Sequence, residues 1–187
     1  LAYEVFSFLL ESGIGVAFVT KGLIPERHRK LFALHAPLVR GQIGLITMDS
    51  AVTSTFEPWA AAPEVRLAQT VELIDAGVQV EARVDPILPG VTDGEECLES
   101  LCAALAGAGV RRIAASVLFL RPAVIGSLRR CVKDQEMVHR LLDRFARAEP
   151  MAIHAENSRV RAIPTEERLE IFHRLKSIAH RYGLEML

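Results

Sequence analysis

The segment from Val78 to Asp85 constrains the fold more than any other, because its residues alternate strictly between apolar and polar. In a strand this alternation separates two faces, one with Val78, Val80, Ala82 and Val84, the other with Gln79, Glu81, Arg83 and Asp85. Helices are predicted on both sides of this strand, which favours a parallel sheet, and parallel strands are normally buried on both faces. Burying charges is costly unless they pair or meet a ligand. We therefore expect the polar face of this strand to mark a functional site.

The rest of the chain repeats strand and helix. Strands are predicted over 14–21, 42–49, 78–85 and 111–120, and their starts lie roughly 27 to 37 residues apart, the size of a βαβ unit. Apolar periodicity and capping residues predict helices over 3–12, 25–35, 63–76, 92–108, 123–131, 134–148 and 165–182. Residues 53–58 are predicted as a loop, 151–163 as a loop or short strand, and 184–187 as the start of another strand.

This pattern predicts an α/β fold, a partial (β/α) barrel, because right-handed crossovers place successive strands in sequence order. A flavodoxin-like doubly wound sheet is the alternative, although the sequence has no glycine-rich nucleotide fingerprint. At 187 residues we expect a single domain, 1–187, with a βα part over 1–122 and a mainly helical part over 123–187. The chain opens on Leu1 rather than Met, so we expect a fragment of a longer protein.

Composition narrows the functional classes. Half of the residues are hydrophobic and the net charge is -1, which argues against disorder and against a global positive field for nucleic acid. No signal-peptide pattern or bilayer-length apolar run occurs, so we expect a cytoplasmic protein without a membrane partner. Cys97, Cys102 and Cys131 lack zinc or redox spacing and predict reduced thiols, and His154 with Glu156 supplies too few ligands for a metal site.

Polar residues gather where the predicted strands end, which is where barrel enzymes place their chemistry. Thr20 and Lys21 end the first strand, Thr47 and Asp49 the second and Asp85 the third, with Arg121 after the fourth. Together they predict a rim that binds a zwitterionic or anionic ligand.

Each of these residues also has a purely structural interpretation. Lys21 could be solvated at a strand end, Asp49 could cap a turn, and Asp85 could be a turn residue before Pro86. Arg83 could pair with Glu81 or Asp85 only to support the strand, and Arg121 could lie outside the barrel.

Local basic clusters raise the question of nucleic-acid binding. They are Arg27, Arg29 and Lys30; Arg129 and Arg130; and Arg159 and Arg161. A phosphate-contacting patch needs them on one face. Aromatic residues make up 6% of the chain, which gives little support for a base-stacking platform. We therefore favour charge pairs on solvated helices, with nucleic acid as a weakly supported partner.

Several segments together resemble the radical S-adenosylmethionine (SAM) enzymes, in the branch around spore photoproduct lyase. The resemblance covers about residues 14–122 and rests on the Thr20–Lys21 strand end, 43–49, Phe56-Glu57-Pro58, 63–67, 76–78 and Asp85-Pro86-Ile87-Leu88-Pro89-Gly90-Val91-Thr92-Asp93. The last element is fairly specific, and the others are weak alone.

The resemblance implies a partial (β/α)6 barrel and a [4Fe-4S] cluster that, with an electron donor, cleaves SAM to a 5′-deoxyadenosyl radical. That radical would act on an unknown substrate, which in this branch includes damaged DNA. By matching position, Lys21 would contact the SAM carboxylate and Thr47 would lie near its ribose or methionyl part. Arg83 and Asp85 would line the lumen as catalytic residues, with Asp85 also next to the cofactor.

The chain departs from this family in two respects. The cluster motif Cys-x3-Cys-x2-Cys is absent, so the cluster ligands are not in this chain, and relatives often carry Ser at the position of Gly44. We expect an enzyme fragment that is inactive alone. An ordinary α/β-barrel enzyme acting on an anionic metabolite and a non-catalytic ligand-binding domain are the alternatives.

Overall fold

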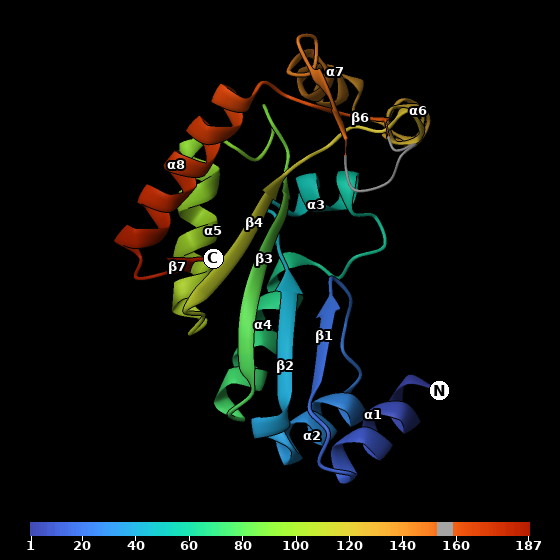
Figure 1. Ribbon diagram of the computed structural model, residues 1–187, viewed down its shortest axis with the longest axis vertical. Coiled ribbons are helices and arrows are strands. Elements are labelled where there is room, and N and C mark those ends of the chain that lie inside the picture. The colour runs from blue at the N-terminus through green and yellow to red at the C-terminus, as the bar shows by residue number, and fades with distance from the viewer. Residues whose placement is uncertain (153–158) are drawn as a thin grey trace.

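The computed structural model describes residues 1–152 and 159–187, so His154 and Glu156 lie outside the described residues. A five-stranded sheet runs through it in the order β1-β2-β3-β4-β7 (Figure 1). Its strands are β1 (Val16–Thr20), β2 (Val39–Gly44), β3 (Gln79–Ile87), β4 (Arg112–Val117) and β7 (Glu185–Met186).

All neighbouring strands of this sheet are parallel and follow the order of the chain. This is the sequential order predicted for a barrel, and it differs from the reversed order of a flavodoxin-like sheet. Among the described strands, β1 and β7 form the two edges and do not pair, so the barrel is partial and open. The predicted partial (β/α) barrel is therefore confirmed.

Helices cover one face of the sheet. In Figure 1, α4 (Pro63–Asp75) and α5 (Glu95–Gly107) lie behind β2, β3 and β4, with α8 (Thr165–Arg181) beside α5. The apolar residues of β3 point into this interface, where Ala82 and Val84 are fully buried. A second apolar cluster joins α1 (Ala2–Glu11) and α2 (Glu26–Leu34) to β1 and β2. The stripe of Ile171, Leu175 and Ile178 on α8 is buried, as its spacing predicts.

The opposite, polar face of β3 is only half-buried, which corrects the expectation of a strand buried on both faces. The side chains of Glu81, Arg83 and Asp85 keep 22%, 35% and 32% of their surface exposed. The open sheet explains the difference, because no described helix packs against this face. Its charges consequently stay in contact with water and carry a smaller desolvation cost than a closed sheet would impose.

Three local predictions were wrong. The second strand ends at Gly44 instead of running over 42–49, and residues 53–58, expected as a loop, largely belong to helix α3 (Ser50–Phe56). Asp49 caps the N-terminus of that helix, since its carboxylate accepts hydrogen bonds from the backbone N–H groups of Ala51 and Val52. The helix expected to reach residue 148 is α7 (Gln135–Asp143), which follows α6 (Pro122–Cys131).

The segment 151–163, left open as a loop or short strand, overlaps a two-stranded antiparallel sheet of β5 (Glu149–Ala152) and β6 (Arg159–Ala162). A short 3-10 turn, η1 (Ala36–Leu38), leads into β2. The expected strand at the chain end is confirmed as β7, which pairs with β4. Within the described ranges, no helix combines the length and the apolar character needed to cross a bilayer.

Candidate functional site at the carboxyl ends of the strands

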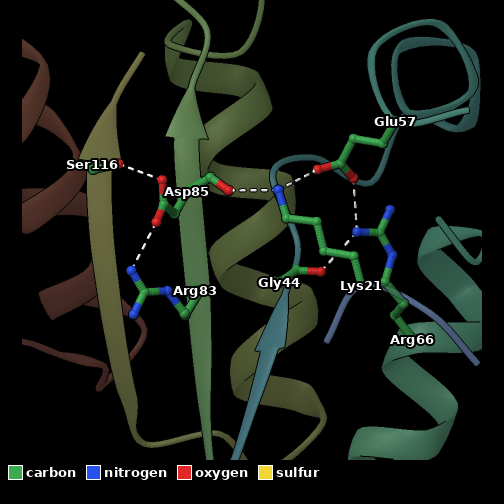
Figure 2. Close-up of polar contacts among 7 residues, drawn as sticks. All are labelled: Lys21, Gly44, Glu57, Arg66, Arg83, Asp85 and Ser116. Atoms are coloured by element: carbon green, nitrogen blue, oxygen red, sulfur yellow. Dashed lines mark hydrogen bonds and ion pairs between the residues drawn. The ribbon is translucent and has the colours of Figure 1, made fainter. Parts of the chain in front are cut away.

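Lys21 follows β1 directly, and its side chain crosses the end of β2 to reach β3 (Figure 2). Its Nζ donates a hydrogen bond to the backbone carbonyl of Asp85 at 2.7 Å. The same nitrogen lies 2.7 Å from Oε1 of Glu57, a charge contact whose angles fall outside hydrogen-bond geometry. An ammonium group has three donors, so at least one of them remains for a ligand. Lys21 is thus held in a defined place while 37% of its side chain stays exposed.

Gly44 makes this path possible. A Cβ atom at position 44 would lie 2.6 Å from Cγ and 2.8 Å from Cε of Lys21, closer than unbonded carbon atoms approach. The absence of a side chain at this position, where relatives often carry Ser, therefore has a structural role of its own. It leaves room for Lys21 to lie across β2.

Glu57 and Arg66 form the other half of the arrangement. Glu57 caps the carboxyl end of α3 and is 8% exposed, while Arg66 lies on α4 and is completely buried. Nη1 of Arg66 donates to Oε2 of Glu57 at 2.8 Å and to the carbonyl of Gly44 at 2.7 Å (Figure 2). Its Nε and Nη2 are buried with no hydrogen-bond partner among the described residues. Such a guanidinium is tolerated only beside a compensating carboxylate.

Asp85 is the most heavily engaged group on the polar face of β3. Its carboxylate accepts hydrogen bonds from Ser116 on β4 and, at 2.8 Å, from Nη2 of Arg83. Burial alone would raise the pKa of Asp85. The hydrogen bonds from Ser116 and Arg83, with the positive charges of Arg83 and Lys21, outweigh burial and hold that pKa below its ordinary value. Asp85 is therefore a carboxylate, unprotonated at neutral pH.

The remaining charges of this face also have partners. Arg83 donates to Oε1 of Gln42 at 3.2 Å, and the amide nitrogen of Gln42 donates to Glu81 at 3.2 Å. Glu81 pairs with Arg112 at 2.9 Å. Of the two carboxylates considered for Arg83, the structure pairs it with Asp85.

The other predicted rim residues do not join Lys21 and Asp85. Thr47 is 1% exposed, and its hydroxyl accepts the backbone N–H of Asp49 and lies 3.3 Å from Sγ of Cys97. Asp49 has the capping role given as its structural alternative, and Arg121 is exposed ahead of α6. Thr20 accepts the backbone N–H of Gly22 at 3.0 Å. The structure thus joins Lys21, Arg83 and Asp85, while Thr47 points away from them toward α5.

Sequence reasoning missed Glu57, Arg66 and Ser116 as members of the site. Glu57 and Arg66 both occur in segments that carry the family resemblance, yet neither follows a strand, where site residues were sought. Ser116 lies inside the predicted fourth strand. In the sheet Ala114 of β4 stands beside Arg83 of β3, and Ser116 is two residues after Ala114, so both point to the same face. The alternation of strand side chains, applied to that strand, is the signal that could have identified Ser116.

Two cavities meet at the Lys21–Glu57 pair, and both are also lined by Phe56. One, of about 400 Å³, opens beside Pro58 and the exposed Trp59. The other, of about 160 Å³, is mostly apolar and extends beneath α6; its further lining is Ile46, Pro86, Leu88, Leu118, Val124, Leu128 and Leu141. A cavity of about 480 Å³ also lies near α7 and α8, but there Arg144 and Arg147 both form ion pairs with Glu167.

The side chains at this rim fit a small anion-bearing ligand and do not fit an iron–sulfur cluster. The described residues contain no group of three or more His, Cys, Asp or Glu able to hold a metal ion. Cys97 and Cys102 lie on α5, and Cys131 ends α6. Burial raises the pKa of the Cys97 thiol, and that of Cys102 to about 11, which disfavours the thiolate form that metals require.

Two of the basic clusters considered for nucleic acid lie far apart. Lys30 and Arg29 on α2 pair with Glu26 and Glu72, whereas Arg129 and Arg130 lie on α6, at the opposite end of the sheet (Figure 1).

No protein-family model matches the chain. Uncharacterized proteins of Mycobacterium tuberculosis and Mycobacterium bovis are each 29% identical to it over 124 residues, which are 65% of this chain and 36% of either relative. The chain therefore matches little more than a third of the length of these curated relatives.

Solved structures match nearly the whole chain at low identity. A point mutant of spore photoproduct lyase aligns with a TM-score of 0.69 and 14% identity, over 99% of this chain and 54% of that one. A domain of pyruvate-formate lyase-activating enzyme from Bacteroides vulgatus gives 0.62 and 18%, over 99% and 87%. Streptococcus suis SuiB gives 0.61 and 10%, over 99% and 35%. The fold of the chain is that of the partial radical SAM barrel.

Proposed function

We propose that the chain forms the cofactor-facing part of a radical SAM enzyme, in which Lys21 binds the methionyl carboxylate of SAM. The observation that carries this proposal is the position of the Lys21 ammonium. It is fixed by Asp85 and Glu57 at the carboxyl edge of the sheet, beside two cavities, and keeps a donor for an anion. Ligands of barrel folds bind at this edge.

The neighbouring side chains would bind and orient the substrate. Arg83 is about one-third exposed, and Gln42 and Asp85 accept hydrogen bonds from two of its nitrogens, which leaves other donors facing the open side of the sheet. Asp85, held as a carboxylate, fixes the plane of the Arg83 guanidinium and offers its carbonyl to Lys21. A ribose contact by Thr47 would require its hydroxyl to leave Asp49 and Cys97.

A [4Fe-4S] cluster would supply the electron that cleaves SAM reductively. The thiolates for that cluster and the docking site of an electron donor would have to come from outside this sequence, since its cysteines do not fit. The free thiols Cys97, Cys102 and Cys131 are compatible with a reducing cytoplasm, where we place the protein. One spore photoproduct lyase structure is complexed with a dinucleoside spore photoproduct, but the basic clusters on α2 and α6, at opposite ends of the sheet, give no support for a DNA substrate here.

Isothermal titration of the chain with SAM and with decarboxylated SAM tests the proposal. We expect SAM to bind more tightly, because only SAM carries the carboxylate for Lys21. Lys21→Met should weaken SAM binding about tenfold or more, the equivalent of one charge-assisted hydrogen bond. Lys30→Met is the matched control, because Lys30 also forms a 2.7 Å ion pair with a glutamate, Glu26, but lies on α2. Equal losses in both variants, or equal affinity for both ligands, would contradict the assignment.

A non-catalytic ligand-binding domain is the second candidate. One observation favours it: Glu81, Arg83 and Asp85 all pair with protein groups, as a purely structural network would. The third possibility, a self-sufficient barrel enzyme, conflicts with the open sheet, whose described edges β1 and β7 do not pair.

A further inference from the structure

Lys21 and Glu57 alone would form a neutral ion pair, but Arg66 adds a second positive charge to them. Lys21, Glu57 and Arg66, here called the rim triad, contain two cations and one carboxylate. We propose that Arg66 is a positioning residue that makes Lys21 a competent anion site, although Arg66 itself touches no ligand. This inference rests on the proposed contact between Lys21 and the SAM carboxylate.

Glu57 alone would work against anion binding. Its carboxylate lies 2.7 Å from Lys21 Nζ and is 8% exposed, so the two form a nearly neutral pair with little charge left for a ligand. Glu57 is nevertheless useful, because together with the Asp85 carbonyl it fixes the end of a long, flexible side chain. A fixed side chain loses less conformational freedom when the ligand arrives.

Arg66 resolves this conflict because its positive charge compensates the negative charge of Glu57. Its Nη1 lies 2.8 Å from Oε2, the carboxylate oxygen that Lys21 does not contact. The guanidinium is fully buried, so water screens its charge little and the interaction is stronger than at the surface. The rim triad therefore keeps one net positive charge, and Lys21, its more exposed cation, presents that charge to the cavities.

Arg66 also fixes the floor beneath Lys21. The nitrogen that contacts Glu57 donates to the carbonyl of Gly44, the residue over which Lys21 lies. Its other two nitrogens, Nε and Nη2, are buried without a hydrogen-bond partner among the described residues, a cost that packing alone does not explain. A methionine of similar length would avoid that cost, but it would leave the carboxylate of Glu57 and the carbonyl of Gly44 without this donor. What the arginine adds is therefore a donor and a positive charge beneath Lys21.

Charge-balanced variants distinguish this role from simple structural support. We would measure the preference for SAM over decarboxylated SAM, by titration, in the wild-type chain, Arg66→Met, Arg66→Lys and Glu57→Gln/Arg66→Met. Arg66→Met should reduce the preference to less than about threefold, because Glu57 then neutralises Lys21. Arg66→Lys should keep the preference. The double variant should return it to within about threefold of the wild type, because both buried charges are gone while Lys21 keeps its own charge and its hydrogen bond to the Asp85 carbonyl.

Arg29→Met is the matched control, since Arg29 pairs with Glu72 at 2.6 Å on another part of the molecule. It should leave the preference unchanged. A folded Arg66→Met chain that keeps its preference would overturn the inference, and so would a folded double variant that does not recover it.

The unfolding temperatures of the same variants test the pairing of Glu57 with Arg66 even when no ligand binds. If the wild-type chain binds neither ligand, the proposed cofactor is wrong while the pairing within the rim triad is still measured. The double variant should then unfold at a higher temperature than Arg66→Met. Additive losses would overturn the compensation between Glu57 and Arg66.

Discussion

Substituting Gly44 by alanine should dislodge Lys21 without disturbing the sheet. The new Cβ would lie 2.6 Å from Cγ and 2.8 Å from Cε of Lys21, whereas carbon atoms in ordinary contact are about 3.5–4.0 Å apart. Lys21 must therefore move by about 1 Å or more. With 37% of its side chain exposed, it can swing into water, at the expense of its hydrogen bond to Asp85 and its contact with Glu57.

The size of the effect follows from these contacts. Overpacking a fitted site typically costs about 1–3 kcal/mol, and escape into water places this case near about 1–2 kcal/mol. In a Lys21→Ala background the clash is absent, and the backbone at Gly44 is outside the left-handed region. Gly44→Ala should then stabilise the fold by about 0.4–1 kcal/mol through the unfolded chain. The two backgrounds should thus differ by about 2 kcal/mol.

Urea denaturation of the four chains in this cycle measures that difference. Gly107→Ala on α5 is the control, because no described atom outside the local backbone of its own helix lies within 4 Å of the added Cβ. It should give the same change in both backgrounds. An equal effect of Gly44→Ala with and without Lys21 would refute the idea that Gly44 is needed to let Lys21 pass.

Three further predictions concern titration and reactivity. Because the pKa of Asp85 is lowered, the stabilising contribution of this carboxylate should be complete near neutral pH and be lost as the pH falls below about 4. The urea midpoint of Asp85→Asn should therefore change less with acidification than the midpoint of the wild type. Burial, with a smaller effect of Arg27, lowers the pKa of His28, so stability should fall as the pH drops below about 6.5, and His28→Leu should remove that loss in thermal melts. Of the three thiols, exposed Cys131 should react fastest with a thiol reagent in the folded chain and partly buried Cys97 more slowly, and rapid labelling of buried Cys102 would show that α5 opens.

Periodicity predicted the fold because its signals are local. The alternation in β3, the stripe on α8 and the regular spacing of strands each follow from a few neighbouring residues, and together they specify a parallel open sheet. The errors occurred where local and tertiary signals compete. The apolar residues after Gly44 continue the strand pattern, although β2 has already ended, and α3 depends on a cap at Asp49.

The site could be predicted only in part. Lys21, Arg83 and Asp85 follow from strand ends and alternation, and the structure does join them. Glu57 and Arg66 come from α3 and α4, so only the folded chain shows that they meet beneath Lys21. The same limit explains Thr47, whose position after a strand suggests exposure while its side chain packs under α5.

Strand register connects these features. In the sheet Thr20 stands beside Ile43 and Gly44 beside Arg83, so Lys21, one residue after Thr20, is level with Gly44. A slip of one residue would place Ile43 or Leu45 beneath Lys21, and either side chain would block its path to Asp85. Hence the same register that buries the apolar face of β3 also leaves open the path across Gly44 by which Lys21 reaches the carboxyl end of β3. A ligand site built this way depends on the sheet as a whole, which is why we expect its affinity to respond to changes at Gly44 and Arg66.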